Sequence, residues 1–270
     1  MFSLFWHELL TRRWAMIGWA IGLTSFGFIY LGIYPSMADQ MSAFDLSAIP
    51  MYEAMGVTDM ASFEGYAAGT FVNFLPILLS IYAITTGTAA LAGEEDDGTL
   101  ELLVTLPLSR WQIGLVKALA IIVTLLIILL GTSIGIMAIF ASIQGEIVTE
   151  IQTADWLLIT LAAWPLALAF GMASLLLGAI APNRRTAGAL ATVFFLANYF
   201  GHAVTGMATA YEGWRPWFLF HYYNNTRTVF TDGLAGGDAA VLLVVALLFG
   251  ALALFAFQRR NLMVGVWVWR

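Results

Sequence analysis

Long apolar stretches and short polar segments alternate along this chain of 270 residues. Each stretch is close to the roughly 20 residues that an α-helix needs to cross the hydrocarbon core of a bilayer. The clearest one, 118–140, is rich in Leu, Ile and Val and carries no charge. The six stretches cover residues 14–33, 70–91, 118–140, 157–181, 187–208 and 239–257. We therefore expect an all-α, polytopic membrane protein with six transmembrane helices, folded as a single domain over residues 1–270.

The composition agrees with a membrane protein, and the distribution of basic residues predicts its orientation in the membrane. Hydrophobic residues make up 61% of the chain and charged residues 10%, which is atypical of a soluble domain. With six spans, nine of the 11 Lys and Arg residues fall on one side of the membrane: Arg12, Arg13, Arg110, Lys117, Arg184, Arg185, Arg259, Arg260 and Arg270. Cytoplasmic loops are enriched in Lys and Arg, so both termini are expected in the cytoplasm. We expect the membrane to be a cell membrane, namely a bacterial inner membrane. The net charge of −6 argues against a nucleic-acid partner.

Residues 1–13 precede the first apolar stretch and have a helical periodicity of their own. Their apolar residues recur at helical spacing: Phe2, Phe5, Trp6, Leu9 and Leu10. A helix with one apolar face can lie in the membrane interface, so we expect an interfacial helix leading into the first span. The alternative is a frayed terminus with a chance periodicity.

Residues 209–238, before the last span, are rich in aromatic residues and are interrupted by Pro216 and several glycines. Such a segment can enter the membrane and return if its backbone is buried against protein. We therefore expect a re-entrant outer segment, and the alternative is an aromatic belt at the interface.

Two local patterns concern the packing of the spans. Gly18 and Gly22, four residues apart in the first span, permit close approach of a second helix, either within the subunit or across a dimer seam. Trp164 and Pro165 predict a kink in the fourth span, because proline lacks the amide hydrogen of the helical ladder.

A polar insert, residues 94–110, separates the second and third spans. Gly98 and Thr99 suit the start of a short helix, and Pro107 ends it. One face of that helix is apolar, made by Leu100, Leu103 and Val104. Ser109 and Gln112 have the spacing of a capping box, which starts the next helix. The pattern predicts a short helix lying across the end of a helical hairpin.

The insert begins with four consecutive acids, Glu94 to Asp97. Their position near a helix N-terminus is favourable, and we expect their outer faces to remain free for a basic groove on another protein. A solvated acidic loop and a divalent-cation site are the alternatives, although cation ligands normally come at loop spacing rather than as a contiguous run.

The chain at this point resembles the type-2 permeases of ABC transporters, whose members carry an acidic pair, Gly-Thr, a Leu-rich stretch, Pro and Arg between the second and third of six spans. The residues that match are Glu94, Glu95, Gly98, Thr99, Leu100, Glu101, Leu102, Leu103, Pro107, Arg110 and Lys117. The resemblance implies that residues 94–110, including Val104, are a cytoplasmic coupling helix that docks on a separate ATPase subunit. It also implies a dimer with a second permease copy or a paralogue, and two ATPase copies that bind ATP and Mg²⁺.

Motifs for chemistry on this chain itself are missing from the sequence. It has no Gly-x4-Gly-Lys-Ser/Thr phosphate loop, no paired-histidine zinc motif and no cysteine, so we expect neither a catalytic residue nor a metal site nor a bound cofactor. Asn198 and His202, four residues apart in the fifth span, form either an inter-helix pair or part of a substrate path.

The resemblance implies a permease subunit of an ATP-driven transporter, embedded in membrane lipid, and the missing motifs favour a protein that is not itself an enzyme. The spans carry no charge at their centres, which favours export of a lipid-like or amphipathic cargo over an ion. Two alternatives stay open: a mechanical transmitter that drives an external partner protein, and an intramembrane enzyme or scaffold.

Overall fold

The computed structural model describes residues 1–41, 62–98, 108–223, 228–231, 233 and 235–260. Most of these residues are helical, and no strand occurs among them. Six helical stretches are long and apolar enough to cross a membrane: Phe2–Met37, Phe63–Asp96, Arg110–Glu146, Asp155–Ile180, Arg184–Met207 and Gly236–Arg259. They coincide with the six predicted spans, so the all-α fold with six candidate membrane helices is confirmed.

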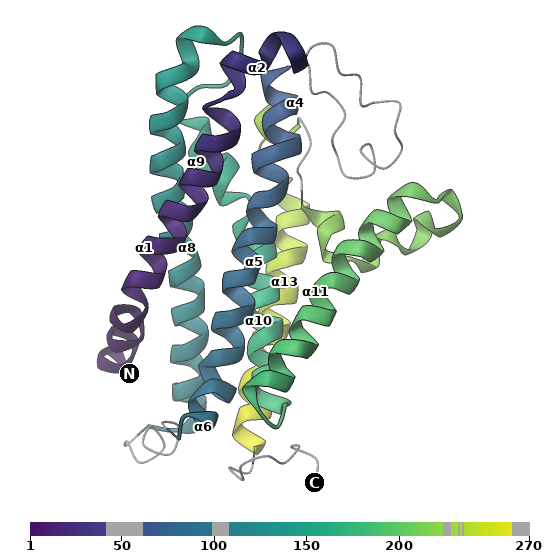
Figure 1. The fold of residues 1–270 in the computed structure, drawn as a ribbon. Coiled ribbons are helices and arrows are strands. Elements are labelled where there is room, and N and C mark those ends of the chain that lie inside the picture. The colour runs from purple at the N-terminus through teal and green to yellow at the C-terminus, as the bar shows by residue number, and fades with distance from the viewer. Residues whose placement is uncertain (42–61, 99–107, 224–227, 232, 234, 261–270) are drawn as a thin grey trace.

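The elements follow one another with few interruptions (Figure 1). Two of the short ones, η1 and η2, are single π-helical turns, and η3 to η5 are 3-10 helices. The bounds of all the described elements are α1 Phe2–Leu31, α2 Tyr34–Met41, α4 Phe63–Ala67, η1 Ala68–Val72, α5 Asn73–Thr88, η2 Ala89–Gly93, α6 Glu94–Asp96, α8 Arg110–Ile143, η3 Gln144–Glu146, α9 Asp155–Leu161, α10 Trp164–Ile180, α11 Arg184–Met207, η4 Thr209–Trp217, η5 Leu219–Tyr222, α12 Thr228–Thr231 and α13 Gly236–Arg259.

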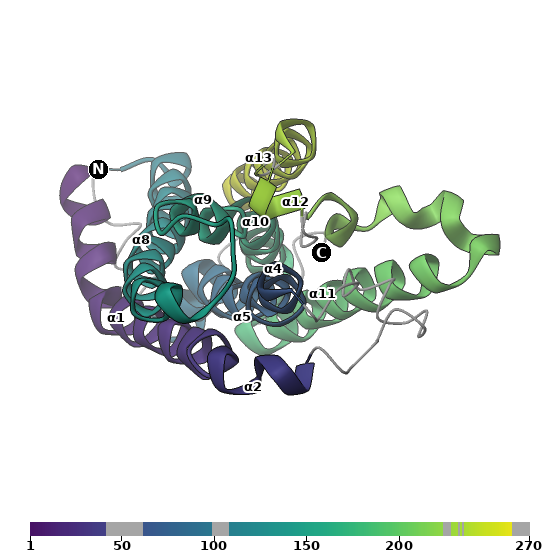
Figure 2. The same cartoon turned by 90° about the horizontal axis from the view of Figure 1, so that it is seen from above.

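Helices α5, α8 and α10 form the centre of the bundle, whereas α1, α11 and α13 lie outside (Figure 2). Helix α10 is apolar on every side and packs against α5, α8, α11 and α13, as a helix without a polar face should. The outer helices expose apolar side chains along their length. Contiguous apolar faces of this kind suit contact with lipid or with another membrane protein.

The bundle has two distinct ends (Figure 1). The lower end carries the N-terminus, α6, the start of α11 and the end of α13, and the upper end carries α2 and α4. Basic residues of α1, α8, α11 and α13 lie near the lower end, as the predicted topology requires.

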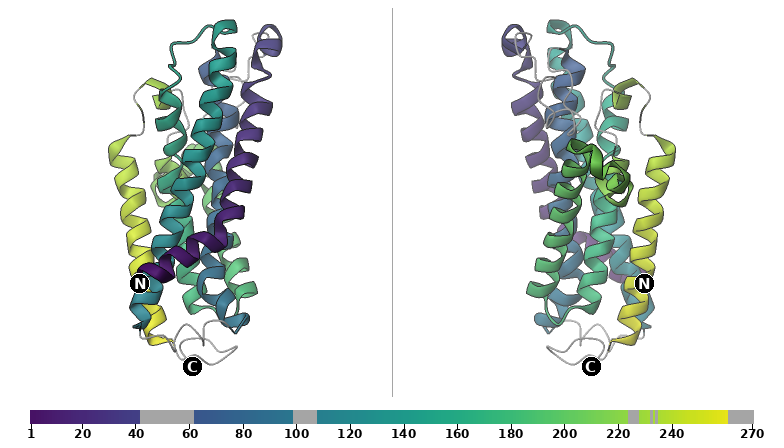
Figure 3. Two further views of the ribbon diagram at one scale, coloured as in Figure 1. Left: turned by 90° about the vertical axis from the view of Figure 1, so that its left-hand side faces the viewer. Right: turned by 90° about the vertical axis from the view of Figure 1, so that its right-hand side faces the viewer.

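The predicted helix of residues 1–13 is continuous with the first span in α1. Figure 3 shows its first turns running obliquely to the rest of the helix. Glu8 and Leu9 face the bundle, while Phe2, Trp6 and Leu10 are exposed. The exposed residues are apolar, which is the arrangement an interfacial helix needs. Its position in a membrane stays a prediction.

A proline inside α5 reshapes the second span. Pro76 has no amide hydrogen, and its ring clashes with the carbonyl four residues earlier, which is that of Val72. The backbone widens into the π-helical turn η1 immediately before this point. The hydroxyl of Tyr223 donates a hydrogen bond of 2.7 Å to the Val72 carbonyl. A residue far along the chain thus satisfies the group that the proline leaves unpaired.

Two local predictions about helix ends are confirmed. The fourth span breaks after Leu161 and resumes at Trp164, with Pro165 in the first turn of α10. At the start of α8, the Gln112 side chain accepts a hydrogen bond of 2.9 Å from the Ser109 backbone N–H, as a capping box requires.

Aromatic side chains fill the upper end of the bundle. Seven of them contact one another through tilted or edge-to-face rings, and we call them the upper aromatic cluster: Tyr34, Phe63, Tyr66, Phe71, Phe140, Trp156 and Phe230. Trp156 is fully buried and contacts four of the other members. The cluster joins six helical segments, α2, α4, η1, α8, α9 and α12, without a charge.

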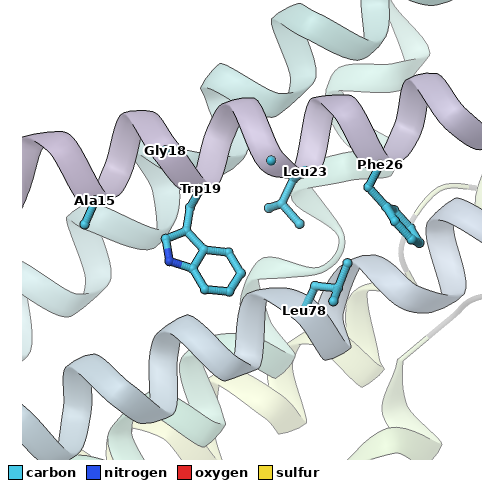
Figure 4. Close-up of a pocket in the computed structure, with 7 residues that line it drawn as sticks. Ala15, Gly18, Trp19, Leu23, Phe26 and Leu78 are labelled. Carbon is cyan, nitrogen blue, oxygen red and sulfur yellow. The ribbon is translucent and has the colours of Figure 1, made fainter.

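An apolar crevice of about 570 Å³ lies between α1 and α5, and Figure 4 shows the residues that line it. Its lining consists of Ala15, Gly18, Trp19, Gly22, Leu23, Phe26 and Leu78. A side-chain carbon added at Gly18 or Gly22 would meet no atom of another described helix within 4 Å. The predicted close helix contact at these glycines is therefore not made by the described part of this subunit.

Candidate functional site

The second span ends in a sharp turn that begins the predicted insert. Helix α6 continues from η2 and stops at Asp96, and the Gly98 backbone has a φ of +71°. Only glycine adopts this left-handed conformation without strain. The Gly98 N–H donates to the Glu95 carbonyl at 3.1 Å, which closes the turn. The remaining predicted docking residues lie outside the described residues, in segment 99–107: Thr99, Leu100, Glu101, Leu102, Leu103, Val104 and Pro107.

Glu94 belongs to a buried group of charges at the lower end. Its carboxylate forms an ion pair with the Lys117 ammonium on α8. The same ammonium lies 2.5 Å from Oε1 of Glu8 on α1, and Oε2 of Glu8 lies 2.9 Å from Arg12. The Lys117 side chain has no exposed surface. We call Glu8, Arg12, Glu94 and Lys117 the lysine bridge, because Lys117 joins α1 to α6 through the two glutamates.

Glu95 makes a second connection, to the end of the last span. Its Oε2 lies 2.5 Å from the Arg260 guanidinium. Nη1 of Arg260 donates to the carbonyls of Gly178 and Ala179, at 2.9 and 3.0 Å. These carbonyls belong to the last turn of α10, where a cation is favourable. Burial lowers the pKa of Arg260, and the neighbouring carboxylate of Glu95 opposes that shift.

Asp96 makes a third connection, to the fifth span. Its Oδ2 accepts a hydrogen bond of 2.8 Å from the backbone N–H of Arg184, the first residue of α11. Amides at a helix start have no partner within the helix, so a carboxylate there is stabilising. Both Asp96 and Arg184 are exposed at this point, and solvent therefore weakens the contact.

The expectation that the first two acids keep their outer faces free differs from the observed geometry. The Glu95 side chain is 9% exposed and that of Glu94 is 23% exposed, and both pair with cations of the same chain. Asp97 is exposed. The physical reason is position: η2 and α6 extend the second span by more than a turn, so Glu94 and Glu95 still face the bundle.

Arg110, another predicted docking residue, also lies at this junction. Its Nη1 donates a hydrogen bond of 2.5 Å to the backbone carbonyl of Arg260. The start of α8, the end of α13 and α6 are therefore joined through two arginines and one glutamate. The role of these groups in docking stays a prediction.

Asn198 and His202 lie apart from this junction, in α11. Oδ1 of Asn198 accepts from the Leu219 N–H at 2.9 Å, and its Nδ2 donates to the Phe194 carbonyl. His202 faces His221, with the ring centroids 6.4 Å apart. Asn198 therefore bonds α11 to η5, and His202 lies near His221 of the same element.

The outer segment leaves the bundle and returns to it (Figure 1). Its first part, η4, exposes Tyr211, Trp214 and Trp217. Its second part, η5, buries Leu219 and Phe220 against α10, α11 and α13. The buried N–H of Leu219 is paired with Asn198, as a backbone returning into a membrane protein requires. Whether this segment enters a bilayer stays a prediction.

Sequence reasoning missed the lysine bridge, although two signals were available. Lys117 is the only lysine of the chain and begins an otherwise uncharged span. A lone cation in such a place needs an acidic partner. Glu8 lies 109 positions before Lys117 in the sequence, and the path of α1 across α8 brings the two together.

Six helices of membrane length and apolar composition make this chain a multi-pass membrane protein. The family model described as ABC-2 family transporter protein matches residues 2–262. The chain therefore belongs to the ABC-2 transporter family, as a membrane permease subunit of an ABC transporter. Membership implies pairing with an ABC ATPase subunit. Among curated proteins, none matches the chain.

Proposed function

We propose that this permease exports a lipid-like or amphipathic cargo and is driven by an ATPase subunit that docks on residues 94–110. The observation that carries the proposal is the anchoring of the insert. Three consecutive acids tie its start to α8, to Arg260 and to α11. A docking element must pass force to the spans, and an element tied to several spans is suited to do so.

The orientation follows from the distribution of charge. The N-terminus, the insert, the start of α11 and the end of α13 share the lower end. Its basic residues suit the cytoplasm, where ATP and Mg²⁺ are available to the partner. Both termini are accordingly cytoplasmic in this proposal.

The nature of the cargo and the dimer follow from the outer helices. Helices α1, α11 and α13 expose apolar faces, and the crevice in Figure 4 is lined by apolar residues and glycine. The charged pairs lie near the lower end rather than along these faces. Apolar surfaces are compatible with an acyl chain or a second permease and unfavourable for a bare ion. We propose a dimer of permeases with two ATPase copies.

Leu103→Asp tests the docking proposal in the complex purified from its own membranes. Burying an apolar side chain contributes roughly 1.5 to 3 kcal/mol, more than the 0.2 to 1 kcal/mol of an exposed ion pair. We expect the variant to insert normally and to lose its ATPase subunit. Val148→Asp is the matched control, because Val148 is 98% exposed and lies beyond η3, at the upper end. Normal ATPase retention by Leu103→Asp would contradict the proposal.

Transport is tested separately, in vesicles that contain the complex and a fluorescent phospholipid. Export predicts ATP-dependent movement of the lipid from one leaflet to the other, and this movement should be absent with Leu103→Asp. Full ATPase retention without lipid movement would favour the mechanical transmitter instead.

A further inference from the structure

We propose that Lys117 is a positioning residue that makes the insert and the first turns of α1 move together. The inference rests on the proposed function for what the movement achieves, namely coupling to the ATPase. The link itself rests only on the lysine bridge. Through this link, α1 becomes part of the coupling device, together with the insert between the second and third spans.

The bridge is balanced in charge and largely buried. It contains two cations and two carboxylates, and Lys117 at its centre is fully buried. Oε1 of Glu8 accepts from the ammonium, and Oε2 of the same carboxylate accepts from Arg12. A buried ion loses its hydration, so removal of one partner leaves another charge uncompensated. The group is therefore stable only when its members stay together.

This property distinguishes the bridge from the apolar packing around it. Apolar side chains can slide past one another with little change in buried area, because the hydrophobic effect has no direction. The two glutamates of the bridge cannot separate from Lys117 without exposing or isolating a charge. A displacement of α6 is therefore passed to Glu8, and the first turns of α1 follow.

The three connections of the insert differ in burial, which ranks them. Lys117 is fully buried and Arg260 is nearly so, whereas Asp96 contacts Arg184 at the surface. Water screens the exposed contact most. The lysine bridge and the Arg260 pair are accordingly the firm connections, and only the former reaches α1.

Hydrogen exchange of the chain alone, in nanodiscs, tests the link without any partner. Lys117→Met should accelerate exchange about tenfold or more in two places, the first turns of α1 and residues 93–98, since both lose the same anchor. Lys117→Arg keeps the cation and should stay near the wild type. Arg13→Met is the matched control, because Arg13 is exposed and stacks on Trp14 outside the bridge. Acceleration at only one of the two places, or at neither, would overturn the proposal.

A triple variant keeps the test decisive if Lys117→Met fails to insert. Glu8→Gln, Glu94→Gln and Lys117→Met together remove the ion pairs, and the one charge that they leave, that of Arg12, is partly exposed to water. Replacing buried ion pairs by neutral groups is often neutral for stability. We expect a normally inserted protein whose exchange is again at least about tenfold faster at both places. Wild-type exchange at both places would overturn the proposal.

The movement is tested in the complex with its ATPase subunit, with and without ATP and vanadate. In the wild type, exchange should change in both residues 93–98 and the first turns of α1. In the triple variant, only residues 93–98 should respond, with the ATPase still bound. An unchanged response of α1 would overturn the link. Loss of ATPase binding by the wild type would contradict the proposed function instead, and the partner-free exchange would still decide the link.

Discussion

The two ends of the bundle are held together by different forces. At the lower end, buried ion pairs join α1, α6, α8 and the end of α13. At the upper end, the upper aromatic cluster joins α2, α4, α8, α9 and α12. Ion pairs fix distances between particular atoms, whereas aromatic rings accept several tilted geometries at similar energy. The lower end is therefore suited to transmit movement, and the upper end to accommodate it.

The largest expected effect is a loss of stability that leaves coupling to the ATPase subunit unchanged. Trp156→Ala removes the centre of the upper aromatic cluster, and the cavity should reduce the free energy of unfolding by about 3 to 5 kcal/mol. Thermal unfolding in detergent measures this loss. Below its lowered melting temperature, the variant should still stimulate its ATPase subunit normally, since the lower end is intact. Wild-type stability of the variant would contradict the stabilising role of the upper aromatic cluster. Lost ATPase stimulation in the folded variant would contradict the assignment of coupling to the lower end. Trp214→Ala is the control, because Trp214 is exposed.

A smaller effect is expected where the outer segment meets the second span. Tyr223→Phe leaves the Val72 carbonyl without its partner, which should destabilise the protein by about 1 to 3 kcal/mol. Exchange around η5 should become faster than in the wild type. Tyr211→Phe, at an exposed position of η4, should change neither quantity. Equal behaviour of the two variants would show that the hydrogen bond contributes nothing.

The smallest expected change in stability concerns the turn before the insert. Gly98→Ala places a side chain at a φ of +71°, which is unfavourable by about 1 to 2 kcal/mol, although the space around it is open. The strain can be relieved by redirecting the insert, so ATPase stimulation should fall more than stability. Gly213→Ala also enters open space, at an ordinary φ, and is the control. Unchanged ATPase stimulation by Gly98→Ala would show that the turn at Gly98 does not contribute to coupling.

The spans were predictable because their signals are local. Twenty apolar residues in a row, the capping box at Ser109 and the break before Trp164 each depend on neighbours in the sequence. The matching residues of the family resemblance all lie within residues 94–117, most of them in the polar insert. These features needed no knowledge of which helices touch.

The partners of the buried polar groups were not predictable, because they come from distant parts of the chain. Glu8 meets Lys117 across 109 positions, and Tyr223 meets Val72 across 151. Proline at position 76 indicated an unpaired carbonyl, and a lone lysine indicated an acidic partner. Neither signal identifies the partner: the donor to the carbonyl in the first case, or the carboxylate that pairs with the lysine in the second. The inward direction of Glu94 and Glu95 depends on η2, a π-helical turn that hydrophobic periodicity does not reveal.

The most direct test of the central claim is a photo-cross-link from the insert in the purified complex. A photoreactive residue at position 103 should cross-link to the ATPase subunit, and one at position 148 should not, because it lies at the opposite end. Cross-linking from position 148 but not from position 103 would contradict the orientation and the docking site together.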